Sequence, residues 1–289
     1  MTNVNMNSIN IKSASLIPLL LLVLALAYTE LTQAAGQLMV APTRIIFEAR
    51  DRTAQVSLVN SGTETETFRL EFVRKRMTET GQFLDIDKPL EGERFSDEMI
   101  RFSPRQVTLP PGQSQTIRLI LRKKANLEAG EYRSHLLFKT IPKTSASSIE
   151  SVGNKDGKNL SIELKPSLGI SIPVIVRHGK TISGVSIDGI KSFYNKKQKK
   201  HIVEFVLARN GNESVYGDLS VNLIKSNGTT YNLARMNGIS VYSPNSKRKV
   251  QMVIYPPKNV SLKQGKLVIV YSKPADAGGA IMAKGSSDL

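Results

Sequence analysis

The 289-residue chain contains no cysteine and no tryptophan, and it has only three histidines. Without cysteine it can form neither a disulfide nor a thiolate metal site. The histidines, His135, His178 and His201, do not have metal-ligand spacing, so we predict neither a metal nor another cofactor. The motifs of phosphate-binding loops, serine hydrolases and zinc proteases are also missing. These absences argue against an enzyme.

Long apolar runs are scarce too, and the main one lies near the N-terminus. Residues 16–28 form a run of thirteen, shorter than the roughly twenty needed for a membrane span but suited to the core of a signal peptide. Thr32 and Ala34 supply small residues at −3 and −1 of a cleavage site. We predict a signal peptide at 1–34, export to a periplasm, and no stable membrane insertion after cleavage. Cleavage after Ala35 and an uncleaved membrane anchor are the alternatives.

Acidic residues are few, and the formal net charge is +16. The excess is concentrated at the C-terminal side, where residues 179–289 hold 14 Lys and 3 Arg against 6 acidic residues. The densest part is 196–200, with four lysines. A basic half of this kind indicates either a polyanion-binding surface or a solvated face that keeps the protein soluble. Aromatic residues make up only 6% of the chain, and it has no RNP-like or helix-turn-helix pattern, so we predict no nucleic-acid partner.

The remaining sequence consists of short alternating segments separated by turn residues. Ile117, Leu119 and Leu121, for example, share one face and follow the turn residues at 109–112. This spacing predicts an all-β chain with two immunoglobulin-like β-sandwich domains, at 35–178 and 179–273. In the second domain we expect turns at several Asn-Gly pairs, including one at 237–238. The small, polar end at 274–289 is expected to be a flexible tail.

The most distinctive segment alternates apolar and polar residues over 160–174, about three times the usual strand length. Pro166 interrupts the apolar row, and proline is confined to edge strands or bulges. A long apolar edge is an aggregation hazard unless another strand pairs with it. We therefore predict a donor strand at 159–177; the alternative is an ordinary strand that runs into the next. One row of side chains comprises Leu160, Ile162, Leu164, Leu168, Ile170, Ile172 and Val174.

Arg44 is the charge that most needs a partner. It follows Pro42 and Thr43 and precedes the apolar residues 45–47. A buried guanidinium is costly unless a carboxylate pairs with it, and its fork of donors suits a bidentate carboxylate. Arg44 is thus a candidate anchor for a carboxylate, with an ordinary surface position in a strand as the alternative.

Several of these segments together resemble a known family. Residues 42–47, Ser103-Pro104, 109–119, 131–133 and Ile141-Pro142 before a long alternating strand are similar, in that order, to the periplasmic pilus-assembly chaperones of the PapD-like family. The resemblance covers about 38–178. In the second domain, 209–218 resembles the divergent, archaic-type branch.

The resemblance implies two immunoglobulin-like domains in an L-shaped, boomerang arrangement with a cleft between them. It implies that the donor strand is lent to a pilin-like subunit lacking its final strand, and that the subunit passes to an outer-membrane usher. Arg44 takes the position of the arginine that holds the subunit's C-terminal carboxylate. The side chains that would fill the subunit's groove are Leu160, Ile162, Leu164, Leu168, Ile170 and Ile172.

The family pairs its cleft arginine with a lysine on the long strand, but 171–177 contains no lysine. Lys165 or Arg177 could replace it, or the carboxylate could be held differently. Glu131 and Arg177 align with two members of a domain-bridging set of ion pairs, and we find no acidic third member near Leu262 and Lys263. Besides a chaperone, the sequence leaves open an exported structural or adhesive protein that binds polyanions through its basic second domain.

Overall fold

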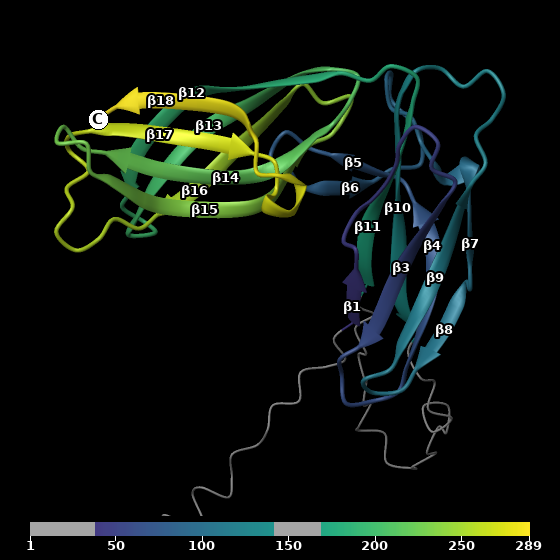
Figure 1. Cartoon of the computed structure of the whole chain (residues 1–289). Helices are drawn as coiled ribbons and strands as arrows, with labels where there is room; N and C mark the ends of the chain where they lie inside the picture. The colour runs from purple at the N-terminus through teal and green to yellow at the C-terminus, as the bar shows by residue number, and fades with distance from the viewer. Residues whose placement is uncertain (1–37, 142–168) are drawn as a thin grey trace, which may run out of the picture.

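The computed structural model describes residues 38–141 and 169–289, and strands make up most of both segments. Their helices are the short 3-10 turns η1 (Asp97–Met99) and η3 (Ala275–Ala277). Neither segment contains a helix long and apolar enough to cross a membrane. Figure 1 shows two β-sandwiches that meet at an angle, so the molecule is L-shaped. The predicted all-β fold with two sandwiches is confirmed, while the predicted signal peptide at 1–34 lies outside the described residues.

The first sandwich has a four-stranded and a five-stranded sheet. The four-stranded sheet has the order β1 (Leu38–Ala41), β3 (Thr53–Asn60), β9 (Ser114–Leu121) and β7 (Ile100–Ser103). The five-stranded sheet has the order β2 (Ile45–Phe47), β11 (Gly169–His178), β10 (Gly130–Ile141), β4 (Glu66–Val73) and β8 (Gln106–Leu109). Alternate residues such as Leu58, Leu119 and Leu136 are fully buried between the sheets, as the sequence pattern predicts.

The chain changes sheets at Pro42. Before it, β1 pairs antiparallel with β3; after it, β2 runs parallel to β11 and pairs only with 174–176. Proline has no N–H, so residue 42 cannot continue a ladder. Two features that follow from this change of sheets position the candidate functional site. Arg44 lies directly before β2, and the outer edge of β11 at 169–173 has no partner strand in the described part of the chain.

A hairpin from the first sandwich joins it to the second. It consists of β5 (Lys75–Met77) and β6 (Phe83–Asp85), which Figure 1 shows beside the second sandwich. Met77 is buried in the second sandwich's core, and its carbonyl accepts a hydrogen bond from Asn245 Nδ2 at 2.6 Å. The backbone N–H of Lys249 donates to the Glu79 carbonyl at 2.7 Å. The hairpin therefore braces one sandwich against the other.

The second sandwich begins after β11 ends at His178. One sheet has the order β12 (Ser183–Asn195), β13 (Lys200–Gly211) and β16 (Lys247–Ile254). The other has the order β15 (Thr230–Val241), β14 (Val215–Ile224), β17 (Lys266–Ser272) and β18 (Ile281–Asp288). Tyr271 is fully buried between them and donates a hydrogen bond to the Ile239 carbonyl at 2.7 Å.

The expectation of a flexible tail at 274–289 is wrong. Its second half forms β18, which pairs antiparallel with β17 to the end of the chain. The small residues there allow close packing: a Cβ on Gly285 would lie 2.8 Å from Ile187 Cγ2, and Ala283 is buried. Small side chains at this end thus fit beneath β12 and do not indicate a lack of structure.

Candidate functional site

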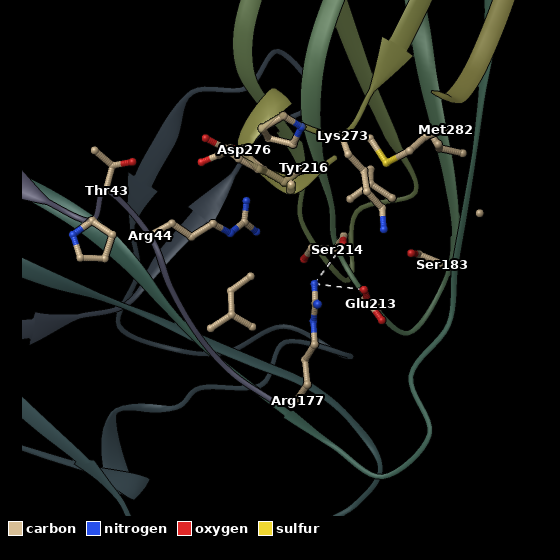
Figure 2. A pocket seen from close by; sticks show the side chains of 17 residues that line it. Thr43, Arg44, Arg177, Ser183, Glu213, Ser214, Tyr216, Lys273, Asp276 and Met282 are labelled. Carbon is tan, nitrogen blue, oxygen red and sulfur yellow. Dashed lines mark hydrogen bonds and ion pairs between the residues drawn. The ribbon is translucent and has the colours of Figure 1, made fainter. Parts of the chain in front are cut away.

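The cleft between the two sandwiches contains a hollow of about 680 Å³. Its lining comes from the β1–β2 junction and the end of β11 in the first sandwich, and from β12, β14 and the β17–β18 connection in the second. Figure 2 shows the charged side chains that converge there. They are Arg44, Arg177, Glu213, Lys273 and Asp276.

Arg44 reaches across the cleft to the second sandwich, as Figure 2 shows. Its guanidinium carbon lies 4.2 Å from the centre of the Tyr216 ring and 5.5 Å from that of Tyr242. Within the described residues, none of its three guanidinium nitrogens has a hydrogen-bond partner, and all three are shielded from solvent. Stacking on aromatic rings compensates only part of the cost of removing the charge from water. Within this part of the chain, Arg44 is therefore a cation without a hydrogen-bond acceptor, and its guanidinium is stacked on tyrosine rings.

Arg177, by contrast, is fully paired. Its guanidinium contacts Glu48 at 2.5 Å, Glu213 at 3.1 Å and Glu131 at 3.3 Å. Glu131 also accepts hydrogen bonds from the backbone N–H and the hydroxyl of Ser214. Because Glu131 is in β10 and both Glu213 and Ser214 precede β14, these contacts bridge the two domains. Arg177 is thus committed to the domain interface.

The acidic third member of this set is Glu213, and sequence reasoning missed it. We looked near Leu262 and Lys263, which lie in the loop before β17, whereas Glu213 precedes β14. The available signal was that Glu213 is one of only two acids, with Asp218, in the segment 209–218, which carries the archaic-type resemblance.

Arg133 and His135 are buried near the place where the hairpin meets the second sandwich. Arg133 stacks on Tyr242, which also contacts Arg44, and its guanidinium carbon lies 4.1 Å from the centre of that ring. Burial lowers the pKa of Arg133. His135 is 2% exposed and packs edge-on to Phe83, with the ring centres 5.0 Å apart. Burial, together with the charge of Arg133, lowers the pKa of His135 to about 3. His135 is thus a neutral, packed side chain. In the described segments, no group of three His, Cys, Asp or Glu residues could hold a metal ion.

The predicted donor strand is only partly within the described residues. Leu160, Ile162, Leu164 and Leu168 lie outside them, as does Lys165. Ile170 is 39% exposed on the open part of β11.

Ile172 was predicted to fill the subunit's groove, but it is a core residue of the chain itself. It is only 2% exposed and belongs to the core of the first sandwich, because its row of alternate residues faces the opposite sheet and it pairs in register with the fully buried Leu136. The open edge begins next to the cleft. Pro173 lines a smaller hollow of about 270 Å³ together with Arg44 and Tyr216.

Comparison with known proteins gives a family and a set of distant structures. Residues 37–177 match the family described as "Pili and flagellar-assembly chaperone, PapD N-terminal domain". No curated relative matches. One similar structure is that of the Acinetobacter baumannii chaperone CsuC with the tip adhesion subunit CsuE. The matched sequences are 15% identical, and the match covers 87% of this chain and 97% of the other at a TM-score of 0.43. The Pseudomonas aeruginosa chaperone CupB2 is 13% identical, covering 86% of this chain and 98% of that one at a TM-score of 0.40. Through this match, the first domain of the chain belongs to the N-terminal domain family of the pili and flagellar-assembly chaperones.

Proposed function

We propose that this chaperone acts in the periplasm on pilin-like subunits by donor-strand complementation and delivers them to an outer-membrane usher. The observation that carries the proposal is the open edge of β11 at 169–173, which leads to the cleft that holds Arg44. A subunit strand added along this edge would gain main-chain hydrogen bonds. It would also bring its end close to an arginine that has no acceptor among the described residues.

Arg44 in this proposal binds the subunit's C-terminal carboxylate. A carboxylate would supply the acceptors that the described part of the protein does not give the guanidinium. Since Tyr216 covers Arg44 in the free protein, the carboxylate would have to displace the ring or slide between the ring and the guanidinium.

The test is co-purification of the chaperone with a co-expressed pilin-like subunit. We expect the double variant Ile162→Ser, Leu164→Ser to lose capture, because each buried side chain contributes about 1.5–3 kcal/mol to filling the groove. Together these losses weaken binding by roughly two to four orders of magnitude.

The matched control is Ser161→Ala, Glu163→Gln, which changes the opposite row of the same segment and should leave capture intact. Circular dichroism and thermal melting should show both variants folded. A lower melting temperature with capture preserved would mean that the apolar row belongs to the chaperone's own core.

A further inference from the structure

Three cations line the larger hollow of the cleft, and only one of them is both exposed and unpaired within the described residues. Arg177 is held by three carboxylates, and the guanidinium nitrogens of Arg44 are shielded from solvent. Lys273 is exposed, lines the hollow of about 680 Å³, and has no side-chain hydrogen bond or ion pair to any described residue. Its ammonium group is thus the cation that an anion entering this hollow can reach first.

The backbone holds Lys273 at this position. It directly follows β17, and its N–H donates to the Ala280 carbonyl at 2.8 Å across the β17–β18 connection. Within that connection, Gly279 N–H donates to the Pro274 carbonyl at 3.1 Å. Figure 2 shows the Lys273 side chain extending into the cleft from the second sandwich, while Arg44 extends toward it from the first.

We propose that Lys273 is the second cation of the carboxylate site and acts with Arg44. This inference rests on the proposed function and deepens it. It explains why the long strand can lack a lysine at 171–177: the second positive charge comes from the other domain. A carboxylate held between Arg44 and Lys273 bridges the two sandwiches, so capture of the chain end also ties the domains together.

The rest of the lining indicates what the last residue of the bound chain should be. Ile46, Val185 and Met282 give the hollow an apolar part beside the cations. Asp276 lines the same hollow and opposes an incoming carboxylate. The chemistry therefore fits a polypeptide that ends in an apolar residue with a free carboxylate.

The test uses N-acetyl-Ala-Ala-Ala-Phe with a free C-terminal carboxylate, and the same peptide as the C-terminal amide. Binding to the full mature chaperone is followed by backbone amide NMR shifts. We expect the carboxylate to bind more tightly than the amide. Lys273→Ala should weaken carboxylate binding roughly 10- to 100-fold, in the range of a charge-assisted hydrogen bond, with no effect on the amide. Lys273→Arg should restore most of it.

The matched control is Lys284→Ala, which changes an exposed lysine of β18 that does not line the hollow and should bind like the wild type. Asp276→Asn, which removes the opposing charge, should tighten binding. If Lys273→Ala binds like Lys284→Ala while Arg44→Ala weakens binding, Lys273 is not the second cation and the proposed function stands. If Arg44→Ala also has no effect, carboxylate capture in this cleft is wrong. Equal binding of carboxylate and amide to the wild type overturns the inference outright.

Discussion

Arg44→Met should separate folding from function. Arg44 has no hydrogen-bond acceptor among the described residues, and its nitrogens are shielded from solvent. An unpaired buried charge of this kind costs several kcal/mol, whereas each stacking contact on a tyrosine returns about 0.5–2 kcal/mol. Methionine preserves the length and apolar contacts of the side chain, and its sulfur can still pack against the rings of Tyr216 and Tyr242. We therefore expect the free energy of unfolding to stay constant or to increase by about 1–2 kcal/mol.

The same substitution should remove subunit capture. Loss of a charged group that hydrogen-bonds a buried carboxylate costs about 2–5 kcal/mol of binding free energy. Stability is measured by urea unfolding followed by far-UV circular dichroism, since the chain has no tryptophan. Capture is measured by co-purification with a co-expressed pilin-like subunit.

Arg177→Met is the matched control for this reasoning. Arg177 is paired with three carboxylates, of which Glu131 is almost fully buried. Its removal leaves that carboxylate without its cation, so we expect a loss of about 3–5 kcal/mol of stability. If Arg44→Met destabilises the protein as much as Arg177→Met does, the description of Arg44 as an uncompensated charge is wrong.

Two further substitutions test the junction between the domains. His135 has a folded-state pKa of about 3, below its ordinary value, so the unfolded state binds the extra proton between these values and stability decreases as the pH falls through this range. At pH 5 this difference lowers the free energy of unfolding by about 2 kcal/mol relative to neutral pH. His135→Leu should abolish this loss, which urea unfolding at pH 5 and pH 7 measures. An unchanged pH dependence of stability in the variant would contradict the description of His135. Met77→Ala should cost about 2–5 kcal/mol by opening a cavity in the second core, measured by thermal melting, whereas the exposed control Leu84→Ala should have little effect.

The sandwich cores could be predicted from the sequence because their strands alternate cleanly. In β3, Val56 and Leu58 are fully buried, as their period of two predicts. The same holds for Ile117 and Leu119 in the neighbouring strand β9. Alternation gives the face of a side chain but not how far along the strand that face stays covered. Ile170 and Ile172 lie in one row, yet only Ile172 lies deep enough in the sandwich to be buried.

Local turn chemistry was a less reliable guide in the second domain. The Asn-Gly pair at 237–238 was expected to be a turn between two strands, but it lies within β15. The register with β14 shifts there, Gly238 takes a φ of +72°, and its N–H donates to Asp218 at 2.9 Å. Glycine permits a bulge as readily as a turn, and only the neighbouring strand decides between them.

The domain interface could be predicted least, because its residues are distant in sequence. Glu131, Arg177 and Glu213 come from three separate elements, and nothing in their local sequence shows that they meet. The same applies to Arg44 and Tyr216, whose stacking depends on the angle between the sandwiches. Arg44 could be singled out because a charge in an apolar segment is conspicuous, but its tyrosine partner could not.

The central claim is that a subunit strand pairs with residues 160–173, of which 169–173 form the open edge of β11. Hydrogen–deuterium exchange measured on the free chaperone and on its complex with a pilin-like subunit tests this most directly. The account predicts strong protection of the amides in 160–173 on binding, with no change in β9, an inner strand of the opposite sheet of the same sandwich. Unchanged exchange in 160–173 within a stable complex would contradict it.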